Sequence, residues 1–446
     1  MSLAVSGWAV LEGLLECAVS ETSASEIARA LLGIAVFIGI AWAVSEQRRK
    51  FPLKPVLIGL AGQFVLALFL TRVPAVTACF GWLARGVDRI QSSSEVGARF
   101  VFGYLSGGPQ PFMAAEPAVS SVIFAFRALP AILFVSALSA LLWHWKILRW
   151  FVSGAAWLFG RLFGVSGPVG VSTSACIFIG MIEAPLLIRP VLPQLSRGEI
   201  FIIMVDGMSV LAGSMMILLG AMLASRVPNA FGHLLTAALI STPMAIGLAR
   251  AIVPSDSFAT TAPLRLENAY RSSLDAIAHG ALFAAKMAAN IVALLIVFVG
   301  LVALVDQGLA LLPHGDAPLT LAGIFGYVLA PVAWFMGVPS ADLQTAGALL
   351  GTKVALNEIV AYGQLVALAP GALSEKGVLI MTYALSSFAN IGSVAILIGT
   401  LTSMAPDRSV EIVQLGFRAL LAALLTTCLT GTTVGILSSI PVLNSL

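Results

Sequence analysis

The chain has 446 residues, of which 59% are hydrophobic and only 10% are charged. A soluble globular domain carries roughly 25% charged residues. This composition therefore excludes an ordinary water-soluble fold and predicts an all-α polytopic membrane protein. The net charge is only +3 and the sequence contains no long basic run, which argues against a nucleic-acid partner.

Cysteine usage and motif content indicate neither a cofactor nor a hydrolytic enzyme. The four cysteines are scattered and form no CxxC pair, so neither a disulfide framework nor a zinc site is predicted. GxSxG, Walker-type and HExxH motifs are absent from the sequence. The first 20 residues carry Glu12 and Glu16 but no basic stretch, so we expect no cleavable signal peptide.

The apolar segments predict about eight membrane-spanning helices of sufficient length. In chain order they are residues 27–44, 56–70, 122–143, 199–224, 233–253, 287–312, 377–401 and 411–436. Three further helices have the mixed composition of interfacial elements, at residues 74–91, 274–286 and 319–336. Polar connections are predicted at 92–117 and 254–273. The short basic loop between the first two spans (SEQRRKFPLK) is typical of a cytoplasmic loop, which places the amino terminus outside.

Two apolar regions, residues 163–193 and 347–369, contain helix-breaking residues and predict re-entrant helical hairpins. Such irregular backbone is tolerated at membrane depth only where protein or a cavity covers it. Each region precedes a helix interrupted by small and polar residues, at 206–214 and 386–393. Two interrupted units in corresponding positions favour a transporter binding site between two repeats.

Each hairpin carries a carboxylate, Glu183 in GMIEAPLL and Glu358 in ALNEIVAY. A carboxylate within the bilayer costs several kcal/mol unless it faces a polar cavity, so both are candidates for ligand binding. A structural alternative for Glu183 is an ion pair with Arg189 or Lys353. For Asn390, in the stretch SSFANIGS, the alternative is a simple helix cap.

In order and spacing, the stretches GMIEAPLL, LGTKVALNEIVAY and FANIGS resemble the concentrative nucleoside transporter family. The likeness extends over nearly the whole chain. It implies a homotrimer in the bacterial inner membrane that imports nucleosides by an elevator-type movement. On this basis we expect scaffold segments at 27–160 and 274–336, and two inverted transport repeats at 163–253 and 347–436.

The resemblance also assigns roles to residues of the second repeat. Glu358 matches the second-hairpin acid that binds the sugar hydroxyls, and Asn390 and Ser393 match the polar pair of the later broken helix that also reaches the ribose. Asn357, adjacent to Glu358, is expected to belong to the same substrate-binding group. Phe388 matches the aromatic residue beside the nucleobase. A carboxylate, amides and a hydroxyl together offer the acceptors and donors that vicinal hydroxyls need.

The first hairpin departs from the family pattern. Glu183 matches the acid on the nucleobase side, but Met181 and Ile182 stand where the family usually has Gln and Thr. A site that loses such polar partners loses discrimination for the groups they paired. A non-nucleoside solute carried on the same fold is therefore the alternative cargo.

The family's sodium site is altered as well. Cys176 replaces an Asn and Val210 replaces a hydroxyl residue, leaving Ile179 and Leu211 to offer only backbone carbonyls. Sodium prefers oxygen ligands, as calcium does. Asp206 lies one turn before Val210 on the same helix face. The coupling ion is thus Na+ or H+, and we favour H+, with Asp206 or the first-hairpin acid titrating.

A third interpretation, from another class, is a ligand sensor or a membrane-embedded enzyme on this scaffold. An intramembrane hydrolase needs a nucleophile–base pair or metal ligands at membrane depth. The sequence offers paired acids but no water-activating set. The leading interpretation is a secondary active symporter without an organic cofactor.

Overall fold

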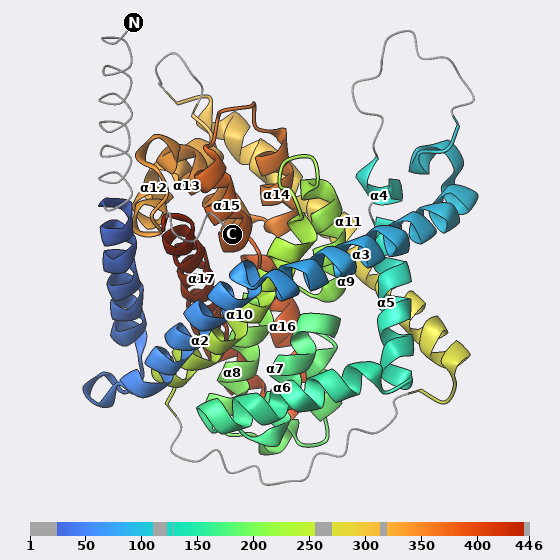
Figure 1. Cartoon of the computed structure of the whole chain (residues 1–446), viewed down its shortest axis with the longest axis horizontal. Helices are drawn as coiled ribbons and strands as arrows, with labels where there is room; N and C mark the ends of the chain where they lie inside the picture. The colour runs from blue at the N-terminus through green and yellow to red at the C-terminus, as the bar shows by residue number, and fades with distance from the viewer. Residues whose placement is uncertain (1–24, 110–122, 128, 255–269, 313–318, 441–446) are drawn as a thin grey trace, which may run out of the picture.

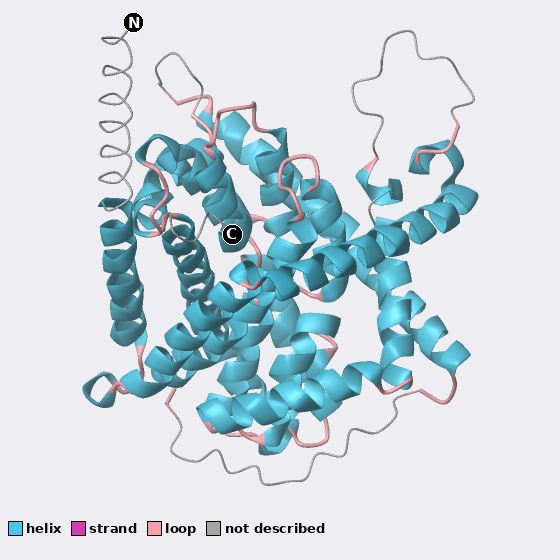
Figure 2. Ribbon diagram, viewed as in Figure 1, coloured by secondary structure: helices cyan, strands magenta, loops and turns pink. Residues whose placement is uncertain are grey.

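The computed structural model describes residues 25–109, 123–127, 129–254, 270–312 and 319–440. Every regular element within these ranges is a helix, as Figures 1 and 2 show. The helices are Ser25–Val44, α2 (Leu53–Arg72), α3 (Pro74–Phe102), α4 (Phe124–Arg127), α5 (Leu129–His144), α6 (Ile147–Phe163), α7 (Gly167–Ile179), α8 (Arg197–Ser209), α9 (Gly213–Leu223), α10 (Ala230–Ile252), α11 (Ser273–Leu309), α12 (Leu321–Phe335), α13 (Leu343–Ala355), α14 (Glu358–Ala367), α15 (Glu375–Ala384), α16 (Ile391–Met404) and α17 (Ser409–Ser438). The prediction of an all-α fold is confirmed.

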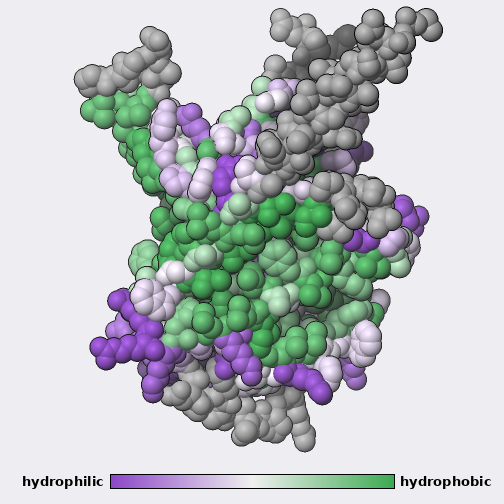
Figure 3. Space-filling model, turned by 60° about the vertical axis from the view of Figure 1, so that its left-hand side comes forward, coloured by the Kyte–Doolittle hydropathy of each residue, from purple (hydrophilic) through white to green (hydrophobic). Residues whose placement is uncertain are grey.

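Seven stretches of the described chain are long and apolar enough to cross a membrane, and they match seven of the predicted spans. The remaining predicted span, 377–401, is divided into α15 and α16 by the non-helical residues 385–390. The span at 197–223 is likewise interrupted, at residues 210–212 between α8 and α9. Figure 3 shows a broad hydrophobic band on the visible face, with hydrophilic residues gathered along its lower edge.

The predicted amphipathic helix at 274–286 is wrong as a separate element, because these residues form the first part of the 37-residue helix α11. The segment contains no proline, and its alanines favour continuous helix. Small residues on one face of α11 pack against α5, among them Gly280, where a Cβ atom would lie only 2.7 Å from the carbonyl oxygen of Ser136.

The predicted loop at 92–117 is also wrong in its first part, because α3 continues to Phe102. The hydroxyls of Ser92 and Ser93 donate to the carbonyls of Asp88 and Arg89 one turn earlier. One turn further on, Glu95 and Arg99 form an ion pair at helical spacing. These local bonds satisfy the polar side chains without ending the helix. Residues 110–122 of this loop, and 255–269 of the predicted linker, lie outside the described chain.

The two hairpin regions differ in their second arms. In the second hairpin both arms are α-helices, α13 and α14. In the first hairpin α7 is followed only by the short 3-10 turns Ala184–Ile188 and Leu192–Gln194. Prolines at 185, 190 and 193 remove backbone donors there, so a regular α-helix cannot form.

The core is built around α8, α10 and α17, which pack against one another and are largely buried. The helix α11 lies at the periphery, with extensive packing only against α5. Figure 1 shows α17 in the interior of the molecule. The chain thus places the ends of both hairpins and both broken helices around one buried centre.

Helices α2 and α10 approach so closely that glycine is required at their contact. A Cβ atom on Gly247 would lie 2.7 Å from the carbonyl oxygen of Pro55. We therefore expect Gly247→Ala to force the helices apart and to destabilise the protein by about 1–3 kcal/mol. The measurement is thermal unfolding of the purified protein in detergent. Gly154→Ala is the control, because nothing lies within 4 Å of its Cβ position, and a similar loss there would contradict the argument.

Candidate functional site

A cavity lies between the two broken units, and the space in it that can hold the centres of water-sized molecules is about 140 Å³. All eight residues predicted to bind substrate line it, together with Ile179 from the predicted ion site. Those eight are Met181, Ile182, Glu183, Asn357, Glu358, Phe388, Asn390 and Ser393. The structure therefore brings both hairpins to one cavity, although Glu183 and Glu358 lie far apart in sequence.

The polar end of the cavity is formed where the amino termini of α14 and α16 meet. Asn357 caps α14, because its side chain accepts a hydrogen bond from the backbone N–H of Val360 at 3.0 Å. Glu358 follows as the first helical residue and is only 3% exposed. Helix amino termini carry partial positive charge, so both helices favour an electron-rich group at this end.

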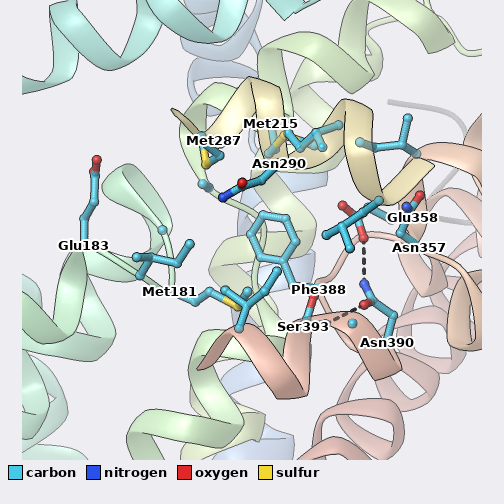
Figure 4. Close-up of a pocket in the computed structure, with 18 of the residues that line it drawn as sticks. Met181, Glu183, Met215, Met287, Asn290, Asn357, Glu358, Phe388, Asn390 and Ser393 are labelled. Atoms are coloured by element: carbon cyan, nitrogen blue, oxygen red, sulfur yellow. Dashed lines mark hydrogen bonds between the residues drawn. The ribbon is translucent and has the colours of Figure 1, made fainter. Parts of the chain in front are cut away.

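Asn390 links the two helix ends. Its Oδ1 accepts from the backbone N–H of Ser393 at 2.8 Å, which caps α16. Its Nδ2 donates to Oε2 of Glu358 at 3.1 Å. Asn390 thus caps a helix and also orients the carboxylate, and the dashed lines in Figure 4 mark both bonds. The arrangement leaves the other oxygen of Glu358 for a ligand.

The first hairpin supplies an apolar wall instead. Gly180 ends α7 with a positive φ of 94°, a conformation that favours glycine. Met181 follows and is buried, whereas Glu183 is half-buried. Figure 4 shows Glu183 at the edge of the view, apart from the Glu358–Asn390 pair. No ion pair joins Glu183 to Arg189 or Lys353 in the described chain.

A third wall, which sequence reasoning missed, comes from α11. Met287, Asn290 and Phe298 lie along one face of this helix and line the cavity. Met215 of α9 adds a further apolar side chain. The available signal was Asn290, the only polar residue between positions 287 and 305.

The predicted ion-site residues lie beside the cavity, where α7 meets the break between α8 and α9. Cys176, Val210 and Leu211 are buried there. The contact is close, since a Cβ atom on Gly213 would lie 2.9 Å from the carbonyl oxygen of Phe178. Within the described chain no cluster of three or more His, Cys, Asp or Glu residues could hold a metal ion.

Asp206 is the unusual group of this region. It is 1% exposed, and its polar neighbour among the described residues is the Thr242 hydroxyl of α10, which donates instead to the carbonyl of Ala238 at 3.3 Å and leaves both carboxylate oxygens without a well-formed hydrogen bond. The titratable group that acts on it electrostatically is Cys176 of α7. An ionised, unpartnered carboxylate is costly in such surroundings, so this side chain needs a proton or a bound cation.

Lys353 stabilises the second broken helix from within. It is fully buried, and its Nζ donates to the carbonyl oxygen of Ala384 at 2.7 Å and to the hydroxyl of Thr427 at 3.2 Å. Ala384 is the last residue of α15, so the ammonium lies at the negative end of a half-helix. Lys353 therefore holds the helix break in place and does not pair with the first-hairpin acid.

A helical membrane protein with a central cavity between two broken-helix units is a secondary transporter in architecture. Three family models match the chain: "Na+ dependent nucleoside transporter N-terminus" over residues 32–105, "Nucleoside recognition" over 125–226, and "Na+ dependent nucleoside transporter C-terminus" over 233–435. The chain therefore belongs to the Na+-dependent, or concentrative, nucleoside transporter family.

Two curated relatives and one solved structure illustrate the similarity. The nucleoside permease NupC of Helicobacter pylori is 32% identical, over 91% of this chain and 96% of its own length. Sodium/nucleoside cotransporter 1 of Rattus norvegicus is 33% identical, over 91% of this chain and 63% of its own length. The inward-facing, substrate-bound structure of CNTnw is 31% identical, with a TM-score of 0.84 over 92% of this chain and 98% of CNTnw. These relatives are transporters, so the chain is an integral membrane transporter and not an enzyme, and an inner-membrane location fits the bacterial relatives.

Proposed function

We propose that the protein is a symporter that imports nucleosides or related ribosyl solutes. One observation carries the proposal: Glu358, oriented by Asn390, lies where the amino termini of α14 and α16 meet at the cavity. Such an end suits vicinal hydroxyls, which donate to the carboxylate and accept from backbone and amide N–H groups. The apolar remainder of the cavity suits a flat ring, with Phe388 beside it.

The direct test is uptake of radiolabelled solutes by the purified protein in proteoliposomes. We expect ribonucleosides to be taken up and to compete with one another. Free nucleobases, which lack the sugar, are expected to compete poorly. Uptake of no ribonucleoside would contradict the proposal.

Met181 and Ile182 support a second candidate cargo, a ribosyl-like solute whose aglycone offers few hydrogen-bonding groups. Their side chains contribute only apolar surface to the cavity. Replacing them together by Gln and Thr is expected to raise the affinity for ordinary nucleosides about tenfold, because one or two new hydrogen bonds form. Competition assays measure the change.

The matched control for that double variant is Leu186→Thr. Leu186 is on the same hairpin but is exposed and outside the cavity. It should leave nucleoside affinity at the wild-type level. An unchanged affinity in the double variant would show that this wall does not contact the base.

For the coupling ion we propose H+, bound at Asp206. The support is the burial of this carboxylate without a partner, together with Cys176 and Val210 at positions where sodium would need oxygen ligands. The Thr242 hydroxyl of α10 also acts on this carboxylate, and Ile179 and Leu211 offer only backbone carbonyls. An uptake assay with separate sodium and proton gradients distinguishes the two ions.

The division into scaffold and moving parts follows the same proposal. We assign the scaffold to residues 27–160 and 274–336, and the transport repeats to 163–253 and 347–436, with an elevator-type movement between them. The mutual packing of α5 and α11 supports a scaffold unit, while α2 and α12 flank the repeats through α10 and α13. A homotrimer is proposed as well, and native mass spectrometry of the detergent-solubilised protein tests it.

A further inference from the structure

The side chain of Asn290 is a polar group in the cavity that the sugar-binding arrangement does not use. It lines the cavity from α11, and Figure 4 shows its amide between Met287 and the ring of Phe388. No hydrogen bond to this amide is found among the described residues. It is also the only polar side chain of α11 between residues 287 and 305.

Among the neighbours of Asn290 that are labelled in Figure 4, no side chain competes with a ligand for hydrogen bonds to its amide. The side chains nearest to it in Figure 4 are apolar, and Glu183 lies apart at the edge of the view. Glu358 is engaged with Asn390 at the polar end. Asn290 is exposed in this structure, so its amide is accessible to a ligand that enters the cavity with complementary donors and acceptors.

We infer that Asn290 is the specificity-determining residue for the nucleobase, through hydrogen bonds between its amide and a donor–acceptor edge of the base. This inference rests on the proposed transport of nucleosides. An Asn amide offers one oxygen acceptor and an NH2 donor side by side. Adjacent N6 and N7 of adenine, or N3 and O4 of uracil, present the complementary pair, and Asn matches such edges in a bidentate manner.

The position of Asn290 in the fold separates this role from that of the hairpins. Its helix packs extensively only against α5, and neither hairpin has more than a slight contact with it. A change at Asn290 therefore leaves the Glu358–Asn390 arrangement in place. Base recognition and sugar recognition are thus carried by different elements and can be removed separately.

The test compares ligands that differ at the hydrogen-bonding edge of the base. Adenosine is paired with purine riboside, which lacks the 6-amino group, and uridine with pyrimidin-2-one riboside, which lacks both the 4-oxygen and the N3–H. Competition with uptake of a labelled nucleoside and stabilisation of the purified protein against heat are both measured. Wild type is expected to prefer the complete base in at least one pair by about tenfold.

Asn290→Leu, which keeps the side-chain size, is expected to reduce that preference to less than about twofold, since the amide is lost. Discrimination between adenosine and its 2′-deoxy and 3′-deoxy analogues should be retained. Ala289→Leu is the control, because Ala289 lies on the same turn but outside the cavity. It should keep the wild-type preference in both pairs.

Three outcomes would overturn the inference. They are an Asn290→Leu variant that still distinguishes the pairs, an Ala289→Leu variant that loses the distinction equally, and a wild type that distinguishes neither pair. If wild type binds none of these ribosides, the proposed function itself fails. That result is recognised because adenosine and its deoxy analogues then fail equally in the competition and heat-stability measurements.

Discussion

Glu358→Gln is expected to lower nucleoside affinity by at least about 100-fold and to abolish measurable uptake. Hydrogen bonds to a charged group contribute about 1.5–3 kcal/mol each, and a vicinal diol would lose two of them. The variant retains the shape of the side chain, and its amide oxygen still accepts from Nδ2 of Asn390. The fold should therefore survive, and radiolabelled uptake together with heat stability measures the two effects separately.

Glu375→Gln is the matched control for this variant. Glu375 occupies the same position in α15 that Glu358 occupies in α14, directly after the residue that caps the helix. It lies outside the cavity, so a general effect of removing an acid from a helix amino terminus would appear there as well. Normal uptake by Glu358→Gln would show that the second hairpin is not the sugar site.

The polar residues of the second hairpin and of the following broken helix could be singled out from sequence because they stand out against apolar neighbours. Asn357, Glu358 and Asn390 are each costly at membrane depth, and the structure gathers all three at the amino termini of α14 and α16. The sequence left cap and ligand contact as alternatives for Asn390. The structure shows that one side chain makes the cap with Oδ1 and reaches Glu358 with Nδ2.

Other features could not be read from local pattern. The continuity of α11 was not predicted, because the charged residues in its first part are also typical of an interfacial helix. The contribution of α11 to the cavity was hidden for a similar reason: one Asn in a long apolar stretch does not show which face meets another element. The position of Glu183 follows from the 3-10 turns of the first hairpin, which propensity alone does not fix.

The structure supports proton coupling through what surrounds Asp206. The helices packed against α8 are α7, α10, α16 and α17, and the titratable side chain that acts on Asp206 from them is Cys176, which carries no positive charge. The buried ammonium of Lys353 is bound to Ala384 and Thr427. No counter-cation therefore accompanies Asp206 within the described chain, and a proton is the simplest way to keep it neutral during movement.

We accordingly expect Asp206→Asn to keep the exchange of nucleoside across the membrane but to lose accumulation of nucleoside driven by a proton gradient. Asn cannot carry a proton, but it resembles the neutral carboxylic acid, so exchange of labelled for unlabelled nucleoside should continue. Accumulation driven by an inward proton gradient should fall to the level seen without a gradient, whereas wild type can gain about tenfold per pH unit for one proton per solute. Asp88→Asn, at an exposed position on α3, should accumulate as wild type does. Sodium-driven accumulation that ignores the pH gradient would contradict proton coupling, and wild-type accumulation by Asp206→Asn would show that the coupling ion does not bind at the Asp206 carboxylate.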